Sequence, residues 1–270
     1  MVNKLFKYEF TYYFRTFGLF LPIVLVIAAV TRAFKLFDDD KVINSITISS
    51  SSALLFMACA ALLTLSVVAS IVRFYKNMYS SEGYLTLTLP VTHSQHIFVK
   101  IVVAMACQAV CLFTVIVAGC IALLKDELAL FLKGFNDLVK DLTYLAGGLN
   151  TTLYIIEFIL LLVLAATMNM LLYYACITVG QTAKKNRILM AVGAYFVYYI
   201  ATQILSTVFI IVLAILGGTG ALNGIGLWME AYPTASVHVV LLFIIGVYTA
   251  MAALFWFVTQ TIMTKKLNLE

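Results

Sequence analysis

Six long apolar stretches constrain the fold of this chain more than any other feature of its sequence. Each contains roughly 20 or more mostly apolar residues, the length that an α-helix needs to cross the hydrocarbon core of a bilayer. Strands of membrane β-barrels are shorter and alternate in hydrophobicity, whereas these stretches are continuous. The sequence therefore predicts an all-α polytopic membrane protein. It forms a single transmembrane domain over residues 1–270, with spans at about 17–34, 53–72, 97–124, 152–179, 188–216 and 236–263.

The composition identifies lipid as the solvent for most of this surface. Hydrophobic residues make up 64% of the chain and charged residues 11%, and the mean hydropathy is +1.06. Soluble domains contain about 45–50% apolar and about 25% charged residues. One globular core cannot bury such an excess, so the spans are expected to face lipid. The five cysteines all lie in apolar runs and are interpreted as small packing residues.

The positions of the basic residues predict the orientation. If the N-terminus lies inside the cell, eleven of the 17 lysines and arginines fall in cytoplasmic segments, as the positive-inside rule requires. Both termini are then cytoplasmic. The net charge of +5 is explained by this bias and by acidic lipid headgroups. No concentrated basic surface is evident, so no nucleic-acid partner is expected.

Two amphipathic segments flank the predicted spans. At helical spacing, residues 1–17 place aromatic side chains on one side and cations on another, which favours an interfacial helix over a simple cationic flank. The aromatic side comprises Phe6, Phe10, Tyr13 and Phe17. Residues 125–150 are too charged to span and predict a surface helix. Residues 35–52 predict a polar connection, and the glycine-rich residues 217–226 a flexible or re-entrant turn.

The connection between the second and third spans, residues 73–100, is the longest polar segment on the predicted cytoplasmic side. Pro90 cannot continue a helix from upstream. Thr92 and Gln95 form a capping-box pattern, which predicts that a new helix starts at about Thr92. Residues 79–91 should then form a structural segment separate from both spans. Their alternating Leu and Thr residues indicate a strand, but such a strand would lack a partner, so a short helix capped by Ser80 or Ser81 is favoured.

This connection resembles the loop between spans 2 and 3 of ABC-2 type transporter permeases. The family carries an acidic residue and Gly, a run rich in Leu and Thr, a Leu-Pro pair and a Lys that opens span 3. The matching positions are Glu82, Gly83, Leu85, Thr86, Leu87, Thr88, Leu89, Pro90 and Lys100. The motif covers about a tenth of the chain. The six spans, the cytoplasmic termini, the N-terminal interfacial helix and the re-entrant residues before span 6 resemble the family more loosely.

The resemblance implies a transmembrane permease subunit of an ATP-driven exporter in a bacterial cell (plasma) membrane. Such a subunit pairs with a second copy of itself and with two copies of an ABC ATPase, which binds ATP and Mg²⁺. The short cytoplasmic coupling helix of the family sits in a groove of the ATPase. The coupling residues expected here are Ser81, Glu82, Gly83, Tyr84, Leu85, Leu87, Leu89 and Pro90. The match is closest to small exporters of amphipathic peptides, such as phenol-soluble modulins or lantibiotics.

The chain itself contains no recognisable catalytic motif. The phosphate-binding pattern GxxxxGK[ST] is missing, so ATP is expected to be hydrolysed by a separate subunit and no cofactor is assigned to this chain. His93, His96 and His238 show no ligand spacing, and neither a metal site nor a Ser/His/Asp site is expected. The expectation is a transport protein and not an enzyme.

Glu157 is the one carboxylate within a predicted span, about two turns from its outer end. An ionisable group at such a depth indicates a functional site, here a gate, a dimer contact or part of a substrate path, with proton coupling as an alternative. Three other functions remain open. The chain could be a lipid or drug exporter, an ion-coupled secondary carrier without an ATPase, or a membrane scaffold or sensor. A carrier would require buried charged pairs near mid-membrane, and Glu157 alone offers little support for it.

Overall fold

The computed structural model describes residues 2–36, 41–80, 83, 88, 91–123, 125–146, 150–183 and 185–265. Side-chain surroundings are also not described for residues 41–45, 125–126, 142–146 and 150–151. Within these ranges the chain is helical, with no strand. The helices are α1 (Val2–Phe17), α2 (Phe20–Leu36), α3 (Lys41–Tyr79), α5 (His93–Ala122), α6 (Lys125–Ala146), α7 (Asn150–Gly180), α8 (Arg187–Gly218), α9 (Asn223–Ala231) and α10 (Pro233–Lys265).

Six of the helical segments are long and apolar enough to cross a membrane, which confirms the predicted all-α fold with six such helices. They are Val2–Leu36, Ile46–Tyr79, His93–Ala122, Thr152–Gly180, Arg187–Gly218 and Pro233–Lys265. The first segment consists of two helices, α1 and α2, separated by a turn at residues 18–19. Pro22 lies in the first turn of α2, where its missing N–H removes no helical hydrogen bond. The chain therefore has the helices of a multi-pass membrane protein.

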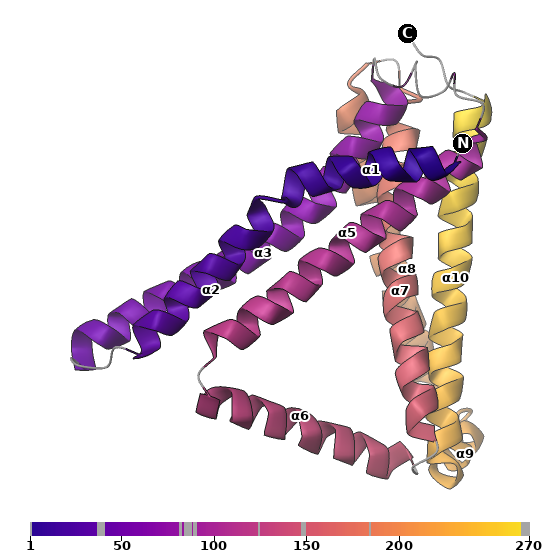
Figure 1. Ribbon diagram of the computed structural model, residues 1–270. Helices are drawn as coiled ribbons and strands as arrows, with labels where there is room; N and C mark the ends of the chain where they lie inside the picture. Colours follow the sequence, from indigo (N-terminus) through magenta and orange to yellow (C-terminus); the bar gives the residue numbers. More distant parts are fainter. Residues whose placement is uncertain are drawn as a thin grey trace. The chain divides into compact units, whose positions relative to one another are not determined.

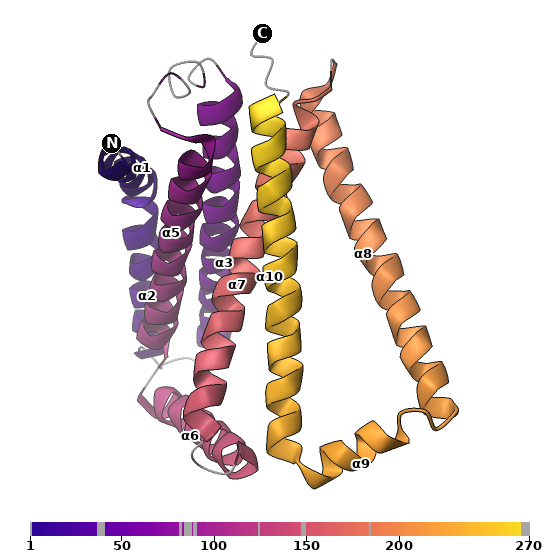
Figure 2. The same cartoon turned by 90° about the vertical axis from the view of Figure 1, so that its right-hand side faces the viewer.

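The helices fall into two compact units, residues 1–138 and 139–270. In the first unit α2 packs against both α3 and α5, and α3 also packs against α5. Figures 1 and 2 show these three helices lying side by side, with α1 crossing near one end of the group. Helix α1 packs mainly against α5. The prediction of a single transmembrane domain concerns the assembly of the two units and stays a prediction.

The core of the first unit combines two aromatic side chains with mostly small and medium apolar ones. It includes Tyr13, Phe17, Val24, Ala28, Leu55, Leu62, Val99, Val103, Cys107, Cys111, Ala118 and Ala122. Small residues let helices approach closely in lipid, where no hydrophobic effect drives helices together. The packing interpretation of the cysteines holds for Cys107 and Cys111, which are buried and carry free thiols. Cys120 is exposed and is no core residue.

Helix α3 is longer than the sequence predicted. Residues 35–52 were expected to be a polar connection, but α3 already begins at Lys41. Within it the hydroxyls of Ser50, Ser51 and Ser52 donate to the backbone carbonyls of the preceding turn at 2.9–3.0 Å. Serine side chains satisfied in this way need no water. The prediction was wrong because it treated the serine run as a loop signal.

The predicted aromatic side of α1 is only partly the buried side. Tyr13 and Phe17 are buried, but Phe10 is 46% exposed. In its place the buried side includes Glu9, which is 2% exposed. Helical spacing places Glu9 with Tyr13, one turn further on, and this arrangement brings a carboxylate inside the first unit.

In the second unit α7 packs against α10 along most of its length and against α8. Figure 2 shows α8 diverging from α10 toward the end where α9 joins them. Helices α7 and α8 approach closely at Gly180, where an added Cβ would lie 2.6 Å from the Cβ of Ala191 and 2.7 Å from the carbonyl oxygen of Arg187. Only glycine allows this approach. The predicted glycine-rich turn, residues 217–226, is helical at both ends, because α8 continues to Gly218 and the short helix α9 begins at Asn223.

Candidate functional site

The predicted coupling residues lie mostly outside the described part of the chain. Of these eight residues, only Gly83 is described. Ser81, Glu82, Tyr84, Leu85, Leu87, Leu89 and Pro90 lie outside the described residues, so the choice between a short helix and a strand stays open. The two ends of this loop are described: α3 ends at Tyr79 and α5 begins at His93.

The capping box predicted at the start of α5 is present. The Thr92 hydroxyl accepts from the backbone N–H of Gln95 at 3.4 Å, and the Gln95 side chain accepts from the backbone N–H of Thr92 at 3.1 Å. These bonds satisfy two donors that a helix start leaves without partners. The loop therefore ends at a defined residue.

Gly83 lies close against the end of α3. Its N–H donates to the carbonyl oxygen of Ser80 at 2.7 Å. A Cβ at this position would lie 2.6 Å from the carbonyl oxygen of Met78. No side chain fits there without movement of the backbone, which gives a steric reason for glycine at this point of the motif.

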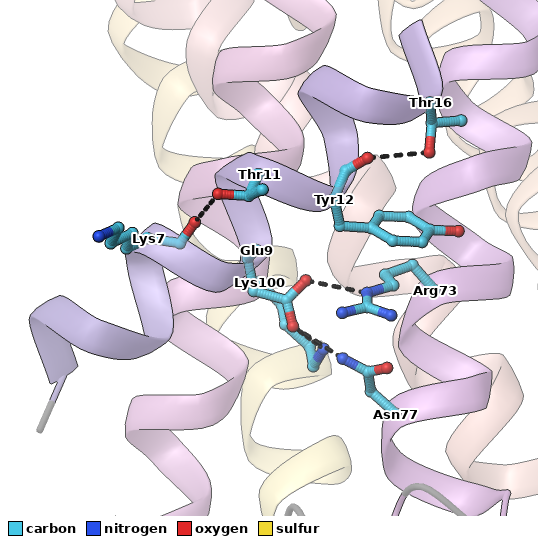
Figure 3. A network of polar contacts seen from close by, with 8 residues as sticks. All are labelled: Lys7, Glu9, Thr11, Tyr12, Thr16, Arg73, Asn77 and Lys100. Atoms are coloured by element: carbon cyan, nitrogen blue, oxygen red, sulfur yellow. Dashed lines mark hydrogen bonds and ion pairs between the residues drawn. The ribbon is translucent and has the colours of Figure 1, made fainter.

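A buried charged cluster lies next to both ends of the loop, and Figure 3 shows its members. The Glu9 carboxylate of α1 accepts from Asn77 Nδ2 and from Lys100 Nζ, each at 2.8 Å. Its second oxygen accepts from Arg73 Nε at 3.2 Å. Arg73 and Asn77 lie in the last two turns of α3, and Lys100 lies in the second turn of α5. We call Glu9, Arg73, Asn77 and Lys100 the Glu9 cluster.

The Glu9 cluster is deeply buried. The Glu9 and Lys100 side chains are each 3% exposed, and that of Arg73 is 18% exposed. The Arg73 guanidinium also lies over the ring of Tyr12, 3.9 Å from its centroid, where the face of the ring attracts a cation. The carboxylate thus joins α1 to the two helices that enclose the loop.

Several buried polar atoms around the cluster have no hydrogen-bond partner among the described residues. They are Asn77 Oδ1 and both ring nitrogens of His96, which lies one turn before Lys100 in α5. A buried polar atom without a partner costs about 1–3 kcal/mol. A buried ion pair adds little net stability, because desolvation offsets the attraction between the charges. Stability alone therefore does not account for this group of residues.

The Glu9 cluster was missed at the level of sequence. Its members lie 64, 68 and 91 positions from Glu9, and no local pattern links them. One signal was present: Glu9 is the only acid among residues 1–17, and helical spacing places it with the aromatic residues and not with the cations. An acid on the apolar side of such a helix indicates a buried basic partner.

Glu157, the acid predicted to lie within a span, is paired with a histidine in the second unit. Nδ1 of His238 lies 2.9 Å from both carboxylate oxygens. The ring of Tyr154 stacks on that of His238 with centroids 4.1 Å apart, and its hydroxyl donates to the carbonyl of Thr234 at 2.7 Å. These contacts hold α7 and α10 in parallel. At 1.5 Å per residue, Glu157 and His238 lie about 8–10 Å from the starts of their helices.

The Glu157 pair is more open than the Glu9 cluster. The two side chains are 16% and 18% exposed, and Nε2 of His238 is buried without a partner among the described residues. His238, for which the spacing of the sequence indicated no partner, is thus the main contact of Glu157. Across the described residues, no group of three or more His, Cys, Asp or Glu side chains could hold a metal ion.

The chain matches no known family model, no curated protein and no solved structure. The class that the fold defines is therefore a helical multi-pass membrane protein with six candidate spans.

Proposed function

We propose that the chain is the transmembrane permease subunit of an ATP-driven exporter in a bacterial cell membrane, with both termini cytoplasmic. It would act as a homodimer with two ABC ATPase subunits, through which ATP and Mg²⁺ enter the cycle, and would carry an amphipathic peptide or another hydrophobic substrate. The support comes from the motif at residues 82–100 and from the six apolar helices that flank it.

The Glu9 cluster is the observation that supports this proposal best. It fastens α1 to the last turns of α3 and to the second turn of α5, on either side of the loop expected to dock on the ATPase. A buried charged network has a strong preference for one geometry. Movement of the loop by an ATPase would therefore pull on three helices together instead of bending one connection.

Co-purification tests the proposal directly. The chain is expressed with an ABC-type ATPase from an adjacent reading frame, if one exists, one partner is affinity-tagged, and ATP hydrolysis is measured in lipid vesicles. We expect a stable complex in the wild type and its loss in Leu87→Asp, with Leu130→Asp in α6 as a control at an exposed position. A wild-type chain that binds no ATPase would overturn the proposal.

The substrate class follows from the same preparation. Stimulation of ATP hydrolysis by an amphipathic helical peptide, and not by phospholipid or by a hydrophobic drug, would identify a peptide exporter. Stimulation by one of the other two compounds would identify the lipid or drug exporter instead.

One observation favours a second candidate, an ion-coupled carrier. Each unit contains a carboxylate that faces a basic side chain of another helix: Glu9 with Lys100, and Glu157 with His238. Carriers use such pairs to bind protons or ions. Substrate uptake or release that is driven by a proton gradient in vesicles without any ATPase, and that is lost in Glu157→Gln, would establish the carrier and exclude the exporter.

A further inference from the structure

Helix α6 has two chemically distinct sides. At 100° per residue one side carries Leu128, Phe131, Leu132, Phe135, Leu138 and Val139. The opposite side carries Lys133, Asp137, Lys140 and Asp141. Phe131, Phe135 and Leu138 are 60%, 58% and 62% exposed. Large apolar residues gathered on one exposed side of a helix indicate a binding surface.

The start of α6 is fixed at one end of the first unit. Lys35, in the last turn of α2, lies 2.7 Å from the carboxylate of Glu127 in the first turn of α6. Arg32 of α2 donates to the carbonyl of Ile121 at the end of α5, at 3.5 Å. Polar contacts thus hold the ends of α2 and α5 and the start of α6 close together. Beyond the ion pair, α6 makes few contacts with other described helices.

We propose that the apolar side of α6 binds the lipid bilayer, with the helix lying at the boundary between headgroups and acyl chains. This boundary is on the membrane face where α2 ends. The occupant follows from continuity, because only two residues separate the start of α6 from the end of α5, itself long and apolar enough to span. A helix that leaves the bilayer at this level meets headgroups on one side and acyl chains on the other.

The charges on α6 indicate which interaction attaches this helix to the membrane. Its polar side carries Lys133 and Lys140 together with Asp137 and Asp141, so the two signs balance. Attraction to anionic lipid requires an excess of basic residues, which this side lacks. The attachment therefore depends on the apolar side chains and is equally strong on zwitterionic and anionic membranes. It depends only on the membrane-spanning fold and not on the transport function.

The experiment measures the depth of each side of α6 in the full-length protein. Single cysteines are introduced at Phe131, Phe135 and Leu138, and at the matched polar positions Lys133, Asp137 and Lys140, in a background without native cysteines. Each variant is spin-labelled and reconstituted in phosphatidylcholine vesicles, with or without phosphatidylglycerol. Relaxation by oxygen, which partitions into lipid, is compared with relaxation by a water-soluble nickel complex.

We expect the ratio of oxygen to nickel accessibility to be severalfold higher at the three apolar positions, with the same pattern in both lipid mixtures. High nickel accessibility at all six positions would overturn the proposal, because α6 would then lie in water. Low accessibility to both reagents at the apolar positions would also overturn it, because a second copy, another part of the chain or bound cargo would then cover them.

A second measurement needs no substitution and remains valid if the cysteine-free variant does not fold. The wild-type protein is reconstituted with phosphatidylcholine that carries a photoactivatable diazirine near the glycerol end of an acyl chain. After irradiation, mass spectrometry locates the lipid adducts. We expect adducts at Phe131 and Phe135 and none at Lys133 or Asp137. Adducts on the spanning helices but not on α6 would contradict the proposal.

Discussion

Glu9 and Glu157 are both carboxylates on helices, and each faces a basic side chain of another helix. The Glu9 carboxylate is held by two cations and an amide and is 3% exposed. The Glu157 carboxylate faces one histidine, and that pair is 16–18% exposed, with one ring nitrogen that has no partner among the described residues. The first network joins three helices, whereas the second is a contact between two helices. The difference separates a deeply buried network from a more exposed pair.

The largest effect should follow from loss of the Glu9 carboxylate. Glu9→Ala leaves the charges of Lys100 and Arg73 buried without their acid, which costs about 3–5 kcal/mol. Unfolding in detergent, followed by circular dichroism and thiol labelling of Cys107, measures the loss. Lys7→Ala, at an exposed position of the same helix, is the control. Equal stability of both variants would show that the Glu9 cluster does not stabilise the packing of α1 against α3 and α5.

Gly83→Ala tests whether the region near the Glu9 cluster is as tightly packed as its contacts indicate. The new Cβ would lie 2.6 Å from the carbonyl of Met78, and overpacking of this kind costs about 1–3 kcal/mol. Hydrogen exchange at residues 75–95 should increase.

Gly134→Ala provides the matched control, because nothing lies within 4 Å of the added Cβ. Alanine stabilises a helix interior by about 0.5–1 kcal/mol relative to glycine. Unchanged hydrogen exchange in Gly83→Ala would mean that the backbone at the end of α3 moves to accommodate the added Cβ at little cost.

The Glu157 pair should be less costly to disturb. His238→Ala removes the hydrogen bond and the stacking on Tyr154, together worth about 1–3 kcal/mol. Glu157→Gln keeps an acceptor for the histidine N–H and should cost less than about 1 kcal/mol. Melting temperatures of both variants in the same lipid check this order. A loss in Glu157→Gln as large as that in Glu9→Ala would remove the distinction between the two acids.

The smallest effect is expected at Lys35, whose ion pair with Glu127 is partly exposed. Lys35→Ala should change stability by about 0–1 kcal/mol, and salt should reduce the difference further. Melting at low and high ionic strength measures it. A large effect that is insensitive to salt would place this pair in the same category as the Glu9 cluster.

The sequence predicts what depends on local or repeated signals. The number of long apolar helices follows from hydropathy, and the start of α5 follows from Thr92 and Gln95, which form their hydrogen bonds within one turn. The partners of Glu9 and Glu157 could not be predicted, because Lys100 and His238 lie 91 and 81 positions away. Such contacts depend on how the helices pack, which periodicity within one helix does not encode.

The serines near the start of α3 bear on where this helix can enter the hydrocarbon region. Hydropathy scales score residues 49–52 as polar, yet the hydroxyls of the last three donate to carbonyls of their own helix. Burying a polar group costs less free energy when the group is hydrogen-bonded. The cost of placing this turn in hydrocarbon is therefore smaller than its hydropathy suggests.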